Sequence, residues 1–395
     1  MTDRSHSFRR ARASSSGPRR GIATVLVMAA TGLAVGGALP ASAAQPRGSG
    51  QVVRQGLDHL VHDDGYPAAL AADLGRDGRT HNYAAGVADL STGAKVPVDG
   101  QVRAGSNTKA FTATVVLQLV GEGKVALDAP VEQYLPNLVR GEGIDGRHIT
   151  VRQLLQHTSG LPDYAEFVGD LVGTQRHTYL QPRTLLDLAL AHKALFAPGT
   201  SWAYSNTNYL LAGLIIEKVT GRPLAEEITH RITERIGLRH TYFPGAGDEG
   251  IREAHPKGYY AQPGGPLEDV TELDPSWAWA AGQMISTPSD LNRFFSALFG
   301  GRLLEPAQLA QMRTTVEVPA GEMWPGARYG LGVTSTALSC GGLMWGHGGD
   351  IPGYQTRTGV TDDGRAVTVA VTADIAPAKQ GPSDVLALLD ATLCR

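Results

Sequence analysis

A helix that must be buried on every side limits what this chain can fold into. From Thr112 to Val120 nearly every residue is apolar, and Gly121 follows as a stop signal. A helix that is apolar all round packs inside a large fold, because it has no polar face to turn toward water. Ser106 and Lys109 stand at the start of this helix. The sequence therefore predicts a buried helix with a hydroxyl and an amine at its beginning.

The pair Ser106 and Lys109 is typical of an activated serine nucleophile. Residues three apart lie on one face of a helix, so the amine can reach the hydroxyl. Burial lowers the pKa of a lysine from about 10.4, which lets the amine accept a proton. Free backbone N–H groups at a helix start favour the oxyanion of an attacked carbonyl, and we expect Gly105 to let a substrate come close. Because a lone Ser-x-x-Lys is common, the prediction depends on partners elsewhere.

A tyrosine and an asparagine are the first possible partners. Tyr204 and Asn206 follow a turn-rich segment, 197–203, and precede an apolar helical run, 209–221. We expect a lysine ammonium nearby to favour the phenolate of Tyr204, which then serves as base to the serine and as acid to the leaving amine. Asn206 can hydrogen-bond a substrate amide. The alternative is that Asn206 only caps a turn or a helix.

The glycine-rich segment 345–350 supplies the third element. It contains His347 and leads into a predicted hairpin of strands, 354–360 and 366–373. Its glycines would let a substrate lie against a strand edge. His347 can donate a hydrogen bond or tune the lysine and the tyrosine, and a purely structural histidine is the alternative.

In this order the three motifs resemble those of the serine penicillin-recognising family, which includes D-alanyl-D-alanine carboxypeptidases and class C β-lactamases. The motifs of the family are Ser-x-x-Lys, Tyr-x-Asn and Lys or His followed by Thr or Ser and by Gly. The chain looks most similar to secreted actinobacterial carboxypeptidases. The resemblance runs from about Gln51 to Cys394 and includes the segments 131–136, 149–161, 204–209, 329–332 and 338–341.

The resemblance implies a role for each site residue. It makes Ser106 the nucleophile, Lys109 its activator and Tyr204 the acid and base. His347 heads the third motif, and Asn206 binds the substrate amide. No metal ion and no cofactor are implied.

The resemblance also implies residues that surround the substrate. The backbone N–H groups of Ser106 and Asp350 would form the oxyanion hole, and Gly348 and Gly349 would lie beside the substrate. Trp277 would be an aromatic wall of the cleft. For this residue the alternative is a tryptophan of the core.

Two departures from the pattern of the family bear on the substrate. The family has a hydroxyl residue where this chain has Gly348, and similar carboxypeptidases have an arginine where this chain has Thr334. Both hold the substrate carboxylate, and each charge-assisted hydrogen bond lost costs about 1.5 to 3 kcal/mol. Arg357 or Arg328 could supply a replacement. We therefore expect an intact acylation site with a weakened preference for a free C-terminal D-alanine.

The sequence thus predicts a serine hydrolase that works through an acyl-enzyme. D-Alanyl-D-alanine carboxypeptidase activity on peptidoglycan stem peptides, with binding of β-lactams, is the first prediction. A class C-like β-lactamase and an esterase or D-amino-acid amidase of the same family are the alternatives. Outside enzymes, the alternative is a protein that only captures penicillin or peptidoglycan.

A metal hydrolase is the rival chemistry. Residues 58–64 hold two histidines and three aspartates. Their spacing matches neither H-E-x-x-H nor another standard zinc pattern. We interpret the segment as the polar face and the end of a helix.

The predicted fold is α/β (α+β) and β-lactamase/transpeptidase-like, an antiparallel sheet flanked by helices with an inserted all-helical lobe. We expect one catalytic unit, in which residues 50–120 and 283–395 form the α/β lobe and residues 121–282 the mainly helical lobe. Strands are expected near 68–74 and 80–88. Further helices are expected at 52–61, 183–192 and 224–236 and after the capping residue Thr287.

Residues 1–43 have the pattern of a signal peptide. Arginines precede an apolar run, 22–39, which ends in Ala41-Ser42-Ala43. The paired arginines leave both Sec and twin-arginine export open. We expect a secreted, extracellular monomer without a stable membrane anchor. The net charge of −3, from 35 basic and 38 acidic residues, gives no case for nucleic acid binding.

The two cysteines, Cys340 and Cys394, are predicted to form a disulfide, because an exported chain meets an oxidising environment. The bond would tie a C-terminal helix, about 383–393, to the strand region ahead of His347. Two free buried thiols are the alternative.

Overall fold

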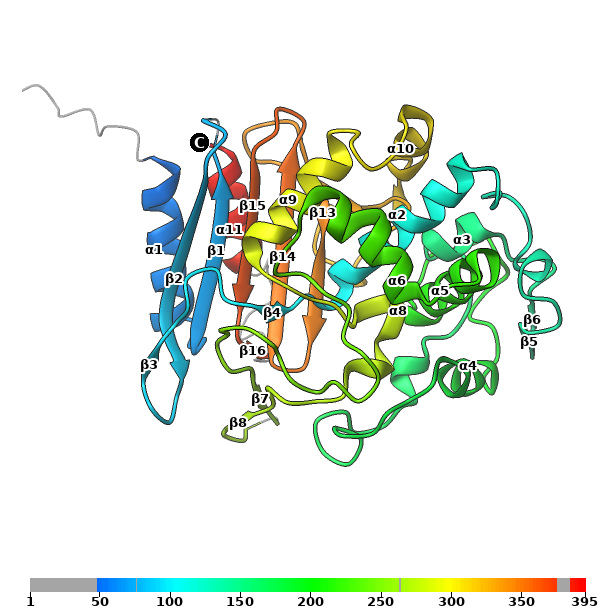
Figure 1. The fold of residues 1–395 in the computed structure, drawn as a ribbon, viewed down its shortest axis with the longest axis horizontal. Helices are drawn as coiled ribbons and strands as arrows, with labels where there is room; N and C mark the ends of the chain where they lie inside the picture. Colours follow the sequence, from blue (N-terminus) through cyan, green and yellow to red (C-terminus); the bar gives the residue numbers. More distant parts are fainter. Residues whose placement is uncertain (1–47, 76, 263, 375–383) are drawn as a thin grey trace, which may run out of the picture. The chain divides into compact units, whose positions relative to one another are not determined.

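The computed structural model describes residues 48–75, 77–262, 264–374 and 384–395 (Figure 1). The predicted leader, 1–43, lies outside these residues. Residues 47–395 group into one compact unit. No helix in the described part of the chain combines the length and the apolar character that crossing a bilayer requires.

A nine-stranded sheet, antiparallel throughout, is built from both ends of the chain, which confirms the predicted fold class (Figure 1). In spatial order its strands are β10 (Val316–Glu317), β11 (Arg328–Tyr329), β12 (Thr334–Ala337), β13 (Leu343–Ile351), β14 (Tyr354–Thr361), β15 (Ala366–Val371), β1 (Ala68–Leu74), β2 (Thr80–Asp89) and β3 (Ala94–Lys95). The predicted strands 68–74 and 80–88 and the hairpin of β14 and β15 are confirmed. β1 is buried on both faces, because helices cover the sheet on both sides.

Three helices cover the two faces of this sheet (Figure 1). α1 (Ser49–His62) and α11 (Asp384–Leu393) pack together on one face, where Val53 and Leu389 meet Val369 of β15. α9 (Pro288–Phe299) packs on β15, β1 and β14. It begins as predicted: the Thr287 hydroxyl accepts a hydrogen bond from the backbone of Asp290.

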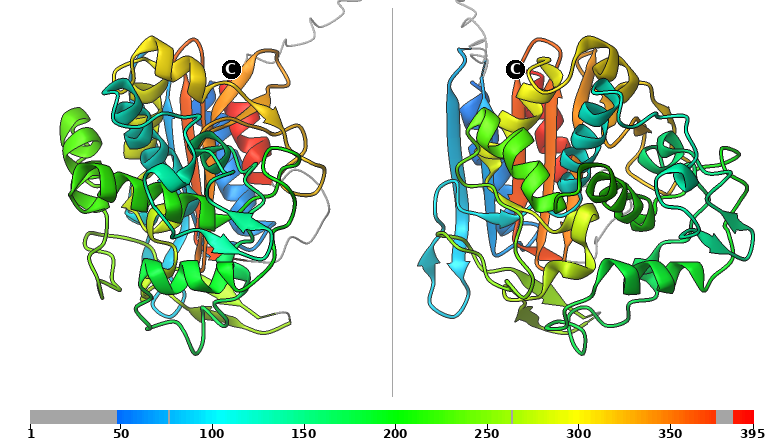
Figure 2. Two further views of the ribbon diagram at one scale, coloured as in Figure 1. Left: turned by 90° about the vertical axis from the view of Figure 1, so that its right-hand side faces the viewer. Right: turned by 45° about the vertical axis from the view of Figure 1, so that its right-hand side comes forward.

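Figure 2 shows that most helices and loops of residues 121–282 gather beside the β13 half of the sheet. The helices of this segment are α3 (Val151–Leu155), α4 (Pro182–Leu190), α5 (Asn206–Thr220), α6 (Leu224–Ile228), α7 (Glu234–Ile236) and α8 (Trp279–Gly282). The predicted helix 224–236 is divided, since a π-helical turn at Thr229–Thr233 separates α6 from α7. α10 (Pro306–Met312) follows α9. Three short pairs complete the sheets: β4 (Val102–Arg103) with β9 (Ile285–Ser286), β5 (Arg140–Gly141) with β6 (Ile144–Asp145), and β7 (Tyr259–Ala261) with β8 (Leu267–Asp269), where β7 also pairs with β16 (Ala373–Asp374).

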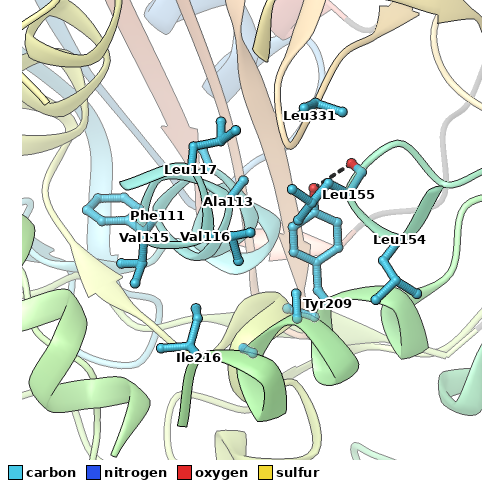
Figure 3. Close-up of a cluster of buried hydrophobic side chains, with 14 of the residues drawn as sticks. Phe111, Ala113, Val115, Val116, Leu117, Leu154, Leu155, Tyr209, Ile216 and Leu331 are labelled. Atoms are coloured by element: carbon cyan, nitrogen blue, oxygen red, sulfur yellow. Dashed lines mark hydrogen bonds between the residues drawn. The ribbon is translucent and has the colours of Figure 1, made fainter. Parts of the chain in front are cut away.

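The helix expected to be buried on every side is α2 (Thr108–Gly121), and it is. Each of its residues from Thr108 to Leu117 is buried. It packs against α5, α6 and α8, where Val115 and Val116 of α2 and Ile216 of α5 belong to the largest apolar cluster (Figure 3). The hydroxyl of Tyr209 in this cluster donates to the backbone oxygen of Leu155 at 2.8 Å. α2 is thus a rigid support for the residues at its N-terminus.

The predicted disulfide between Cys340 and Cys394 is confirmed. It joins the turn between β12 and β13 to the end of α11, with 5.6 Å between the two Cα atoms.

We expect Cys394→Ser to lower the free energy of unfolding by about 4 kcal/mol, because a closed loop of 54 residues no longer restricts the unfolded chain. Urea titration with and without reductant measures this loss. Reduced wild type should match Cys394→Ser, and reductant should leave the variant unaffected. An unchanged unfolding midpoint in the variant would contradict the prediction.

Candidate active site

Ser106 lies in a single 3-10 turn, η1 (Gly105–Asn107), that leads directly into α2. Gly105 has φ +52°, and a Cβ there would lie 3.0 Å from the backbone nitrogen of Asp350. A Cβ at Gly349 would lie 2.0 Å from the backbone oxygen of Ala104. Both glycines are therefore required for β13 to pack against the Ser106 turn. The sequence analysis gave another reason for Gly105, which was space for a substrate. The packing brings the backbone nitrogen of Asp350 close to Gly105.

Side chains of neighbouring elements fix the Ser106 turn. Asn107 donates to the backbone oxygen of Ala104 at 3.0 Å and to the hydroxyl of Thr356 at 2.6 Å. Thr108 donates to the backbone oxygen of Gly105 at 2.8 Å. All of these side chains are buried. The turn is thus held to β14 as well as to α2.

Lys109 is fully buried and its amine touches the nucleophile. Nζ lies 3.0 Å from Ser106 Oγ, 2.7 Å from Asn206 Oδ1 and 2.9 Å from the backbone oxygen of Ala281. Burial lowers the pKa of Lys109 to about 7, against the opposite effect of the carboxylates of Asp163 and Asp350. A neutral amine donates two hydrogen bonds, here to Asn206 and Ala281. Its lone pair is then left to receive the proton of Ser106.

Asn206 connects Lys109 to a carboxylate. Its Oδ1 accepts from Lys109, and its Nδ2 donates to Asp163 Oδ2 at 2.9 Å. The pKa of Asp163 is raised, chiefly by burial. Asn206 is the first residue of α5, so the helix begins three residues before the apolar run 209–221 from which we predicted it. The sequence analysis missed Asp163. The one sequence feature that could have pointed to it as a site residue was its position two residues after the segment 149–161, which supports the family resemblance.

Tyr204 is a neutral phenol rather than a phenolate. Burial raises its pKa well above the ordinary value, the nearby Tyr329 adds to this, and a hydrogen bond with Ser106 acts in the opposite direction. The amine of Lys109 lies 4.8 Å from the centre of the tyrosine ring. The expectation that a lysine ammonium favours the phenolate is therefore wrong, because removal of both groups from water favours their neutral forms. Lys109 is the better base, and the phenol can relay a proton.

His347 is a buried, neutral imidazole. Its Nδ1 donates to the backbone oxygen of Gly348, and its Nε2 accepts from the Tyr329 hydroxyl at 2.9 Å. Burial, with a smaller effect of Lys109, lowers its pKa to about 3. Both ring nitrogens are thus engaged within the protein. The ring of Tyr329 lies edge-on to that of Tyr204, with 6.5 Å between the ring centres, so Tyr329 contacts both His347 and Tyr204.

A second buried histidine, which the sequence analysis did not single out, packs behind Tyr204. The ring centres of His157 and Tyr204 are 4.4 Å apart. Nδ1 of His157 accepts from the backbone of Ser205 at 3.2 Å and from the side chain of Asn208 at 3.0 Å. Burial holds its pKa well below the ordinary value. His157 therefore fixes the position of Tyr204 without carrying charge. It lies in the segment 149–161, which served only to support the resemblance.

The residues expected around the substrate lie in different settings. Trp277 is half-buried between two apolar clusters, and its indole N–H has no hydrogen-bond partner among the described residues. Thr334 is buried and donates to the backbone oxygen of Gly346 at 3.1 Å. Of the two arginines proposed as replacements, Arg328 pairs with Glu317, whereas Arg357 lies against Gly348.

The rival metal hypothesis concerns another part of the chain. Among the described residues, the side chains close enough to share a metal ion are those of His59, Asp64 and Asp384, whose candidate ligand atoms lie within 4.8 Å of one another. They lie at the ends of α1 and α11, with no ligand from the elements that carry Ser106. The helix interpretation of residues 58–62 is confirmed, and Asp63 caps it.

The assembled groups suit nucleophilic attack on a carbonyl. The amine of Lys109, whose pKa is lowered, lies close enough to Ser106 Oγ to accept its proton, and the phenol of Tyr204 is within reach of the same hydroxyl. The backbone nitrogen of Asp350 lies beside the Ser106 turn, where an N–H group can stabilise an oxyanion. This is the chemistry of acyl transfer.

The Beta-lactamase family model matches residues 53–393. Among solved structures, the D-stereospecific amidohydrolase from Streptomyces sp. is 41% identical with a TM-score of 0.78, over 86% of this chain and 98% of that chain. The D-amino acid amidase from Ochrobactrum anthropi SV3, solved with L-phenylalanine amide, is 28% identical with a TM-score of 0.76, over 87% of this chain and 97% of that chain.

Curated relatives are matched over shorter stretches. Penicillin-binding protein 4 of Amycolatopsis lactamdurans is 30% identical over 260 residues, which are 63% of this chain and 65% of that protein. The chain spans about half the length, 48%, of protein flp from Staphylococcus aureus (strain N315), to which it is 27% identical over 61% of its own length.

Proposed function

The chain belongs to the Beta-lactamase family and is a serine hydrolase of that family, and from this premise we propose that it hydrolyses amides and esters of D-amino acids through an acyl-enzyme on Ser106. The observation that carries the proposal is the contact of 3.0 Å between the buried amine of Lys109 and the Ser106 hydroxyl. Likeness to a D-stereospecific amidohydrolase and a D-amino acid amidase over most of the chain supports the substrate class. This places the amidase alternative ahead of the D-alanyl-D-alanine carboxypeptidase that was our first prediction.

In the proposed mechanism, Lys109 accepts the proton of Ser106 as Oγ forms a bond to the carbonyl carbon of the substrate. The N–H groups of Ser106 and Asp350 hold the oxyanion. The proton then passes, through Lys109 or the phenol of Tyr204, to the amide nitrogen, and ammonia leaves as the C–N bond breaks. Water attacks the resulting ester by the same steps in reverse, which releases the D-amino acid and returns the proton to Ser106.

D-Alanyl-D-alanine carboxypeptidase activity is the second candidate. It is favoured by the identity of 30% with a penicillin-binding protein over 260 residues. Its substrates and ligands would be the predicted ones, peptidoglycan stem peptides and β-lactams.

For either activity we also propose that the protein is secreted, as the leader predicts, and that it is a monomer.

A comparison of substrates tests the proposal. We expect release of ammonia from D-phenylalanine amide with a kcat/KM about 100-fold above that for the L-enantiomer, since misplacing the reacting carbonyl in a fixed site costs about this much. D-Alanine release from diacyl-Lys-D-Ala-D-Ala should be slower. Intact mass after incubation with benzylpenicillin shows whether a stable adduct forms. Faster release of D-alanine than of ammonia, together with such an adduct, would instead support the carboxypeptidase.

A further inference from the structure

An ion pair joins β13 to β14 at the end of β13 whose backbone packs against the Ser106 turn. β12 pairs with β13 only from Leu343 to Gly346, so the end of β13 that carries Asp350 has no strand partner on that edge among the described residues. The backbone nitrogen of Asp350 faces Gly105, while its side chain is 57% exposed. The exposed carboxylate therefore belongs to the same residue, Asp350, whose backbone N–H holds the oxyanion in the proposed mechanism.

The partner of Asp350 is Arg357 of β14. Arg357 lies opposite Gly348 in the strand register. Its Cδ, Nη1 and Nε atoms are 3.1 to 3.3 Å from the position of a Cβ at Gly348, so the absence of a side chain there leaves room for the guanidinium. Nη1 donates to Asp350 Oδ1 at 2.9 Å and to the backbone oxygen of Thr356 at 2.9 Å. The arginine is only 13% exposed.

We propose that the Asp350–Arg357 pair selects substrates whose leaving group is uncharged, because Asp350 neutralises the arginine that would otherwise bind a carboxylate beside Gly348. The inference rests on the proposed function and specifies its substrate class. A leaving group with a free carboxylate meets the negative charge of Asp350 before it can reach Arg357. An amide or ester leaving group has no such charge to repel.

Two further observations support this inference. The hydroxyl of Thr334 is turned into the sheet toward Gly346 and is not offered to a substrate. Arg357 Nε is buried without a hydrogen-bond partner among the described residues, so the guanidinium retains donor capacity that Asp350 does not use. The charges of the pair also act on the reacting groups: Asp350 raises the pKa of Lys109, and Arg357 lowers that of His347.

The test uses two substrates with the same acyl group, D-phenylalanyl-D-alanine and D-phenylalanyl-D-alaninamide, and measures the ratio of their kcat/KM values. In wild type the uncharged leaving group should be preferred. Asp350→Asn should lower this preference at least about tenfold, chiefly through a lower KM for the free acid, since a freed Arg357 gains a charge-assisted hydrogen bond. Arg357→Gln should move the ratio the other way, because Asp350 is then unpaired.

Asp363→Asn is the matched control. Asp363 is 52% exposed and also pairs with an arginine, Arg365, but both residues lie in the turn between β14 and β15. Asp363→Asn should leave the ratio of the two kcat/KM values as it is in wild type. An unchanged ratio in Asp350→Asn, in an enzyme that hydrolyses D-phenylalanine amide, would overturn the inference alone. A wild type inactive on every D-phenylalanyl substrate would overturn the proposed function and this inference with it.

Discussion

Replacing Ser106 by alanine is expected to lower kcat/KM for D-phenylalanine amide by at least about 10⁴-fold, because alanine has no side-chain oxygen to attack the carbonyl. Ser106 lies in a turn that is held by Asn107 and Thr108, and its own side chain makes few contacts besides Lys109 and Tyr204. The fold should therefore survive the substitution. The measurement is ammonia release by purified wild type and variant at equal concentration.

Intact mass separates the loss of the nucleophile from a general loss of activity. Wild type incubated with an activated D-phenylalanyl ester should gain one acyl group, and Ser106→Ala should gain none. Ser201→Ala, at an exposed position on the loop before Tyr204, is the control and should label as wild type does. Covalent labelling retained in Ser106→Ala would refute the assignment of the nucleophile.

Replacing Lys109 by methionine is expected to lower kcat/KM by about 10²- to 10⁴-fold, the range for loss of a general base. The base must be neutral to accept the proton of Ser106, and its pKa lies at about 7. Wild-type kcat/KM should therefore rise with pH through about 7 and level off above it. In Lys109→Met the residual activity should lack this rise. The pH profile is thus a readout that a structural defect alone would not produce.

Lys193→Met is the matched control for this prediction, since Lys193 is exposed. It should keep both the rate and the rise near pH 7. Methionine resembles lysine in volume and introduces no charge. It leaves Asn206 Oδ1 and the Ala281 oxygen without their donor, so a moderate loss of stability is expected. A rise near pH 7 that persists in Lys109→Met would show that another group titrates there.

The burial that lowers the pKa of the lysine also explains why the tyrosine differs from our expectation. Tyr204 and Lys109 share surroundings with little water, and each charged form is disfavoured there. A phenolate beside an ammonium would require two charged groups to be removed from water at once. A proton shared among a neutral amine, a neutral phenol and the Ser106 hydroxyl avoids this free-energy cost. Motif spacing carries no information about this balance, because it depends on how much water the folded chain removes.

The sequence alone determined the features that depend on residues close together in the chain. The spacing of Ser106 and Lys109 placed both at the start of α2, and the all-apolar run after them predicted its burial. Turn and capping residues predicted the hairpin of β14 and β15 and the start of α9. These features follow from backbone geometry and helical periodicity, which act over a few residues.

Only the tertiary structure decided which distant groups meet at the nucleophile. Asp163 reaches Lys109 through Asn206, and Ala281 supplies a backbone oxygen from a different helix. Of two candidate arginines, it placed Arg357 beside Gly348 and against Asp350. Each of these contacts joins segments that are far apart in the chain, and each pKa depends on the burial that those segments create together. The physical reason is that the spacing of residues fixes only the face of one helix or strand on which a side chain lies. Contacts between distant side chains, and their removal from water, arise only when the elements pack.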